Sequence, residues 1–201
     1  HILQHPLLRD ILFGVVTRFG ATTISEAIAY DTERSSILWR SGLDSGNSIK
    51  FLSGSPNENL IVVGGRFVTE EGGANSNLRL LNALTGESIR DFVGVEELDV
   101  TSTVWHGSRI LISHSSRTDR TVSGSMIIDH GIAEGFITWH DASTGQLLRR
   151  IPSPLRQARA LQQSTDEQLI AFAGYEGAAI IDASSGNVLS QIHMADIHGP
   201  E

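Results

Sequence analysis

A short turn motif that recurs four times places the strongest constraint on the fold of this 201-residue sequence. Its clearest copy runs from Asp141 to Gly145 between two apolar segments, and further copies end at Gly86 and Gly186. A degraded copy has Ser35 at the glycine position. In such a turn the Asp or Asn side chain accepts hydrogen bonds from backbone amides, and the glycine takes the left-handed conformation that ends a bulged hairpin. The motif therefore predicts pairs of antiparallel strands.

Aligned on the glycine position, the chain divides into four units, each with four strands in the order a, b, c and d. The aligned positions are 51, 59 and 41 residues apart, and an interval near forty residues is typical of repeats that each form one four-stranded sheet. We therefore predict an all-β chain without helices. The predicted units are 1–41, 42–94, 95–153 and 154–194, and 195–201 would begin a linker or a further unit.

The extra length of the longer units falls between strands b and c. These connections are 17–25, 64–77 and 113–135, and the two long ones are rich in Gly, Ser, Asn and charged residues, as exposed loops are. If the units stack side by side, all b–c connections emerge at the same edge. The sequence therefore predicts one elaborated edge, which is the strongest indication of a binding face.

Candidate binding residues lie in or beside these connections. An arginine followed by phenylalanine occurs after strand b in the first two units, and this pair of residue types is favoured at binding hot spots. The alternative interpretation is a repeat remnant in which the phenylalanine packs between units. The candidate partner-binding residues are Arg18, Phe19, Arg66, Phe67, Arg117, Asp119, Arg120 and His130.

Composition excludes several classes of partner. The net charge is −8 with few lysines, which argues against nucleic acid or an anionic membrane as the main partner, because both need a basic surface. The absence of cysteine removes disulfides, thiolate chemistry and cysteine-ligated zinc, but it leaves the cellular compartment open. No apolar run approaches the ~20 residues that span a bilayer. The sequence therefore predicts a protein partner, with no nucleic acid and no membrane.

No residue pattern indicates catalysis. His106, His114, His130 and His140 fall within one unit, but no pair has an established ligand spacing, so ordinary polar or buried histidines are favoured over a metal site. Two pairs of adjacent glutamates would point to opposite faces of a strand. The glycine-rich stretches do not precede a helix, so they are not phosphate loops. We predict no catalytic residue, no metal site and no cofactor.

Segments 80–86 and 139–145 resemble the end of a WD40 repeat. Asn82, Asp141 and Asp182 stand where that family has its aspartate, although Leu81, His140 and Ile181 replace the family's tryptophan. The first unit is instead similar to quinoprotein-like propellers, because Asp31 is followed eight residues later by Trp39. At the Trp39 position the other units have Arg90, Arg149 and Ser190.

These resemblances imply about four blades of a β-propeller, belonging to a larger ring of seven or eight blades, with a closed four-bladed ring as the alternative. They imply a non-enzymatic scaffold that binds protein through its b–c face, and that associates with itself or with remaining blades of the same parent protein. The alternative is a fragment of a propeller enzyme with its site at the ring centre. An enzyme would gather ionisable residues at the starts of the strands a, which are Ser48, Leu98 and Ala158, so the scaffold is favoured.

Overall fold

The computed structural model describes residues 2–18, 24–42, 48–68, 74–92, 98–116, 120–123, 126–129, 135–155, 158–174 and 176–193. Every regular element among these residues is a β-strand, and no helix that could span a membrane occurs among them. The strands form four antiparallel four-stranded sheets and one separate two-stranded hairpin. The all-β prediction is confirmed.

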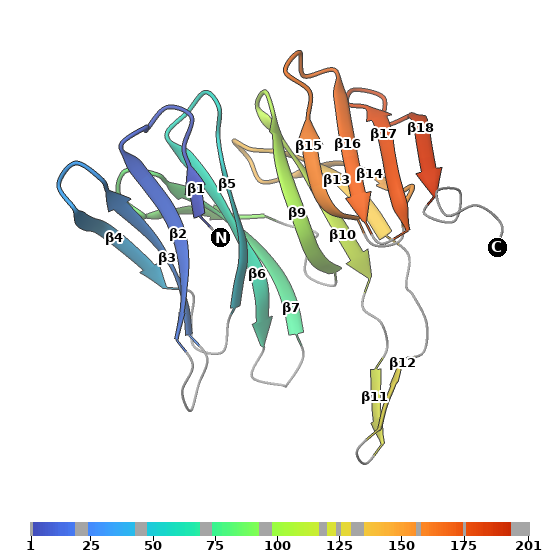
Figure 1. Cartoon of the computed structure of the whole chain (residues 1–201), viewed down its shortest axis with the longest axis horizontal. Helices are drawn as coiled ribbons and strands as arrows, with labels where there is room; N and C mark the ends of the chain where they lie inside the picture. The colour runs from blue at the N-terminus through green and yellow to red at the C-terminus, as the bar shows by residue number, and fades with distance from the viewer. Residues whose placement is uncertain are drawn as a thin grey trace, which may run out of the picture.

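Each four-stranded sheet is one unit, with its strands in the order a, b, c and d, and the four sheets lie side by side (Figure 1). The first sheet comprises β1 (Ile2–Gln4), β2 (Ile11–Arg18), β3 (Ile24–Asp31) and β4 (Ser36–Gly42). The second comprises β5 (Ser48–Gly54), β6 (Leu60–Val68), β7 (Ala74–Asn82) and β8 (Ser88–Asp91). The third comprises β9 (Leu98–His106), β10 (Arg109–Ser116), β13 (Gly135–Asp141) and β14 (Leu147–Pro152). The fourth comprises β15 (Ala158–Gln163), β16 (Leu169–Gly174), β17 (Gly177–Asp182) and β18 (Val188–His193).

The recurrent turn has the same geometry in every unit. The turn glycines Gly86, Gly145 and Gly186 have φ of 73°, 71° and 69°, and Ser35 has φ of 50°. In all four units the residue after the Asp or Asn donates its backbone N–H to the carbonyl just before strand b, over 2.8–2.9 Å. These donor and acceptor pairs are Thr32 with Asp10, Ala83 with Asn59, Ala142 with Ser108, and Ala183 with Gln168. The predicted left-handed glycines are therefore present, and each turn ties strand c to the start of strand b.

Replacing Ser35 with glycine is expected to raise the free energy of unfolding by about 0.5 kcal/mol, because glycine adopts the left-handed conformation without a steric penalty while making the unfolded chain freer. Urea unfolding at equilibrium measures the change. The adjacent Ser36 begins β4, so Ser36→Gly is the matched control and should be destabilising. A loss of stability in Ser35→Gly would contradict the assignment.

A second consequence of the turn concerns acid stability. The Ser185 hydroxyl and amide and the Ser184 hydroxyl bond the Asp182 carboxylate and lower its pKa from 3.8 to about 2. A depressed folded-state pKa stabilises the fold above the unfolded value, and the contribution is lost as pH falls from 3.8 towards 2. We expect Asp182→Asn to flatten the fall in melting temperature over this range. Asn82 shows that an amide accepts the same backbone bonds, from Leu84 at 2.8 Å and Thr85 at 3.2 Å.

The reverse change, Asn82→Asp, is the matched control and should make the melting temperature fall more steeply in the same range. Thermal unfolding followed by circular dichroism between pH 6 and pH 2 measures both variants. An unchanged acid profile in both would contradict the link between the turn and acid stability.

The hydrophobic core lies between neighbouring sheets. Successive side chains of β6 pack against different neighbouring sheets. Ile61 and Val63 pack with Phe13 of the first unit, whereas Val62 packs with Ile110 of the third. Successive side chains of a strand point to opposite faces, so a strand buried on both faces is apolar throughout. The strands a are in contact across the sheets, β1 with β5, β5 with β9, and β9 with β15.

All three predicted b–c loops contain paired strand. In the first, Thr17 stands opposite Ser25 and Arg18 opposite Ile24. Within 64–77, β6 and β7 remain paired out to Val68 and Ala74, because the ladder uses backbone groups and tolerates polar side chains. Gly64 lies inside β6, where the Phe51 ring covers it and leaves no room for a Cβ atom. The prediction of loop from position 64 onwards was therefore wrong for most of this segment.

The third b–c connection also contains strand. β10 continues to Ser116, and β13 begins at Gly135. Between them β11 (Arg120–Ser123) pairs with β12 (Met126–Asp129) in a hairpin that projects beyond the third sheet (Figure 1).

Candidate functional site

The b–c connections of the first three units lie along one edge of the row of sheets. Figure 1 shows the ends of β2, β6 and β10 towards this lower edge, with the β11–β12 hairpin extending from it. Because the strands of each sheet are antiparallel and in sequence order, the a–b and c–d turns lie at the opposite edge. We call this lower edge the b–c edge. Its described residues are 17–18, 24–25, 64–68, 74–77, 113–116, 120–123, 126–129 and 135.

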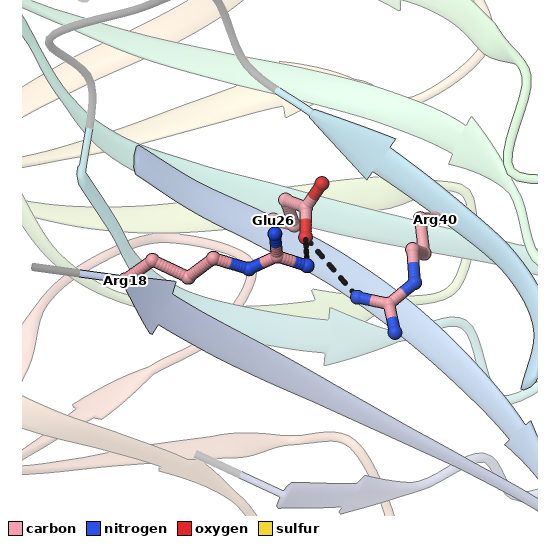
Figure 2. Close-up of polar contacts among 3 residues, drawn as sticks. All are labelled: Arg18, Glu26 and Arg40. Atoms are coloured by element: carbon pink, nitrogen blue, oxygen red, sulfur yellow. Dashed lines mark hydrogen bonds and ion pairs between the residues drawn. The ribbon is translucent and has the colours of Figure 1, made fainter. Parts of the chain in front are cut away.

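Arg18 is the candidate residue whose side chain the structure places at this edge. Its Nη2 lies 3.3 Å from Oε2 of Glu26 on β3, and Nη1 of Arg40 on β4 lies 3.2 Å from the same oxygen (Figure 2). The Arg18 side chain is 64% exposed, whereas Glu26 is 21% exposed. Exposed ion pairs contribute roughly 0–1 kcal/mol, so this cluster does little for stability. Two guanidinium groups share one carboxylate, which leaves this three-residue cluster positively charged.

Sequence reasoning missed both partners of Arg18. Glu26 is the one charged residue of β3 before its terminal Asp31, and this departure from an otherwise apolar strand was the available signal. Arg40 lies directly after Trp39 and gave no comparable signal, because a charged residue on an outer strand is ordinary.

The two Arg-Phe pairs do not occupy equivalent positions. Arg18 is the eighth residue of β2, whereas Arg66 is the seventh residue of β6, where it stands opposite Ser76. A shift of one residue moves a strand position to the other face of the sheet. The pairs are therefore not copies of one repeated contact, and Arg66 and Phe67 lie within strand b rather than after it.

The remaining candidates belong to the third connection, except Phe19, which belongs to the first. Arg120 begins β11 opposite Asp129. The other four candidates, Phe19, Arg117, Asp119 and His130, lie outside the described residues.

Comparison with known proteins establishes the fold. No family model and no curated protein matches the sequence. A solved structure described as "Structure of Dos1 propeller" is similar over 92% of this chain and 45% of its own, with 15% identity and a TM-score of 0.61. The hydrazine synthase of Kuenenia stuttgartiensis is similar over 90% of this chain and 52% of its own, with 13% identity and a TM-score of 0.67. The chain is a partial β-propeller. It spans about half the length of both similar chains, and its four sheets are propeller blades.

Tryptophans join two of the three blade interfaces. Trp39 of blade 1 donates its Nε1–H to the carbonyl of Ala83 in the turn of blade 2, over 3.0 Å. Trp139 of blade 3 donates in the same way to the carbonyl of Ala183 in blade 4, over 3.1 Å. The two tryptophans come from different strands, β4 and β13, yet they reach the same position in the next blade.

The two blade 3 histidines whose side chains are described, His106 and His140, have separate surroundings. His140 is fully buried, as its place beside the turn predicts, and its ring packs edge-on against Phe92. His106 Nδ1 lies 2.6 Å from Nε2 of Gln163. The His114 side chain and His130 lie outside the described residues, and among those that are described no three His, Asp or Glu side chains form a metal-ligating group.

His5 contributes to the interface between blades 1 and 2. It is fully buried, its Nε2 lies 3.1 Å from the Leu60 carbonyl, and its Nδ1 accepts the Leu7 amide over 3.2 Å. Burial lowers the pKa of His5 from 6.5, so the imidazole is neutral with its proton on Nε2. Sequence reasoning did not single out this residue.

Proposed function

We propose that the protein is a non-enzymatic propeller scaffold that binds another protein along the b–c edge. The proposal rests on one observation: the connections between strands are long at the b–c edge and short at the opposite edge. At the b–c edge, β6 and β7 form a long hairpin and the β11–β12 hairpin is added, whereas short turns such as 83–87 and 142–146 join strands at the other edge. Loop closure tolerates insertion at either edge, so a binding requirement is the simplest reason for one-sided growth.

The charge at this edge supports the same proposal. The exposed Arg18 and its neighbour Arg40 give the edge two guanidinium groups against the single carboxylate of Glu26. Arginine combines charge with planar hydrogen-bonding geometry and is enriched at protein interfaces. The positive charge is confined to this cluster on blade 1, because the b–c connections also contain acidic residues such as Glu70, Glu71 and Asp129, so the cluster favours a single acidic group on the partner.

A second contact surface is the uncovered face of blade 4. Leu169, Ile180 and Ile192 are 36%, 38% and 52% exposed on this face. The corresponding faces of blades 2 and 3 are buried against the next blade, and contiguous apolar patches of this kind mark interfaces. We propose that further blades of the same parent protein, or a second copy of the chain, cover it.

The second candidate function is a segment of a propeller enzyme with its reaction site at the ring centre. The likeness to a hydrazine synthase favours it. We place it second because the strands a, which contact one another across the blades, begin with Ser48, Leu98 and Ala158, none of which is ionisable.

Charge reversal at the b–c edge tests the scaffold proposal. Arg18→Glu combined with Arg120→Glu should weaken capture of the partner at least about tenfold without lowering the melting temperature. The matched control is Arg9→Glu combined with Arg34→Glu, two exposed arginines in turns of the opposite edge. If the first variant retains every partner and the control loses them, binding lies at the opposite edge and the proposal is wrong.

A further inference from the structure

His5 connects the first turn of blade 1 to blade 2. It lies between β1 and β2, and its Cδ2 lies 2.9 Å from where a Cβ atom on Gly54 of β5 would begin, so the glycine makes room for the ring. The imidazole packs against Phe13 with 5.9 Å between ring centroids, and Phe13 packs against Trp39 at the same distance. His5 is therefore the end of an aromatic row that lies in the interface between blades 1 and 2.

Both ring nitrogens of His5 form hydrogen bonds while the imidazole is neutral. Nδ1 accepts the Leu7 N–H over 3.2 Å, and Nε2 donates to the carbonyl oxygen of Leu60 at the start of β6, over 3.1 Å. A second proton would bind at Nδ1 and face the Leu7 N–H, because an imidazolium has two donors and no acceptor. The protonated ring therefore cannot keep the bond to Leu7, which holds the turn of residues 5–8 around the ring.

No described carboxylate compensates for a positive charge on the buried ring. His5 is fully buried and forms no ion pair with a described residue. The charged residues on the turns and strands packed around it are Arg9, Asp10, Arg18, Lys50, Glu58 and Arg66. Those in the turns, Arg9, Asp10 and Glu58, are exposed, and those in the strands stand four or more residues from Phe13, Gly54 and Leu60, which contact His5. Burial lowers the pKa of His5 from 6.5, and the hydrogen bonds to the backbone of Leu60 and Glu58 oppose this only in part.

We propose that His5 is an acid-sensitive contact between blades 1 and 2, in which proton binding at Nδ1 breaks the Leu7 hydrogen bond and releases the turn of residues 5–8 from blade 2. Because the pKa is lowered in the closed interface, an open interface binds the proton more readily. The His5 contribution to the interface is therefore complete above pH 6.5 and is lost as the pH falls below that value. This range is separate from the range of 3.8 to 2 in which the Asp182 contribution is lost.

Protonation of His5 in the full chain tests the first step. Long-range proton–nitrogen NMR spectra of the histidine rings, recorded from about pH 8 to about pH 5, report which ring nitrogens carry a proton. His5 should be less than half protonated at pH 6.5, where an unperturbed histidine is half protonated. Half protonation of His5 at or above pH 6.5 would overturn the proposal.

Hydrogen exchange of the same protein, corrected for the intrinsic effect of pH on exchange, measures opening of the interface. From about pH 7.5 to about pH 5.5 the amides of β2 and β6 should lose protection at least about threefold. The limit is about tenfold, because one pH unit below 6.5 about nine in ten free imidazoles are protonated. Strands β16 and β17 of blade 4 contain no histidine and should change less than about twofold.

His5→Gln removes the titrating group, so the protection of β2 and β6 should become independent of pH in this range, even if the variant is less stable at every pH. The matched control, His106→Gln, removes a histidine that contacts Gln163 between blades 3 and 4, and should keep the wild-type response in β2 and β6. The proposal is wrong if these two strands keep their protection in the wild type at the lower pH, or if His5→Gln loses it as the wild type does. An equal loss in β16 and β17 would indicate general acid destabilisation and would also overturn it.

Discussion

Replacing Gly86 with valine is expected to lower the free energy of unfolding by about 3 kcal/mol, through backbone strain and overpacking together. Gly86 has φ of 73°, a conformation that a β-branched residue adopts only with strain. A Cβ atom at this position would also lie 2.5 Å from the ring of Trp39. The ring would have to move, and with it the hydrogen bond to Ala83 that joins blades 1 and 2.

Gly107→Val separates the two contributions. Gly107 has φ of 55°, but nothing lies within 4 Å of a Cβ built there, so this variant carries the backbone cost alone, about 1–2 kcal/mol. Urea unfolding followed by circular dichroism measures both variants. Equal losses at Gly86 and Gly107 would show that the contact with Trp39 contributes nothing to the interface.

The turn was predictable because its signals are local. The aspartate or asparagine side chain accepts hydrogen bonds from backbone amides within the same five-residue turn. The motif therefore forms the same turn in each unit without help from distant residues. The starts predicted for three of the strands a, Ser48, Leu98 and Ala158, are the first residues of β5, β9 and β15. Ser35 shows the limit of the rule, because its φ of 50° is imposed by the surrounding turn despite an unfavourable side chain.

The extents of the b–c connections were not predictable in the same way. Segment 74–77, Ala-Asn-Ser-Asn, has a composition typical of loops, yet it pairs with β6 because backbone groups form the ladder whatever the side chains are. Gly64 looks like the end of a strand in sequence, whereas in the structure it makes room for the Phe51 ring. That contact joins residues from two strands, so neither segment of the sequence alone contains a signal for it.

The candidate sites depended on tertiary contacts to a greater degree. Arg18 was identified, but its partners Glu26 and Arg40 come from the next two strands and are set by register. The interface between blades 2 and 3 was harder still, because Arg90 and Leu80 stand where the neighbouring interfaces have a tryptophan. Only a comparison of all three interfaces shows that blade 2 contributes no indole.

Trp139 supplies the second large effect that we expect. Trp139→Ala should lower the free energy of unfolding by about 3–5 kcal/mol, because truncation of a large buried aromatic side chain leaves a cavity. The side chain is 2% exposed and packs with Leu161, Ile170 and Phe172 at the interface of blades 3 and 4. The guanidinium of Arg149 lies 5.3 Å above its ring, so the arginine would also lose its support.

Phenylalanine substitutions separate the hydrogen bond of Trp139 from its packing. Trp139→Phe removes the bond to the Ala183 carbonyl, whereas Trp105→Phe removes a buried N–H that has no partner in the described chain. Trp139→Phe should therefore cost about 1–3 kcal/mol more than Trp105→Phe, because only the first leaves a buried acceptor unpaired. Far-UV circular dichroism in urea measures both, since each change removes a fluorophore. If Trp105→Phe proves the more destabilising, the hydrogen bond of Trp139 does not stabilise the interface between blades 3 and 4.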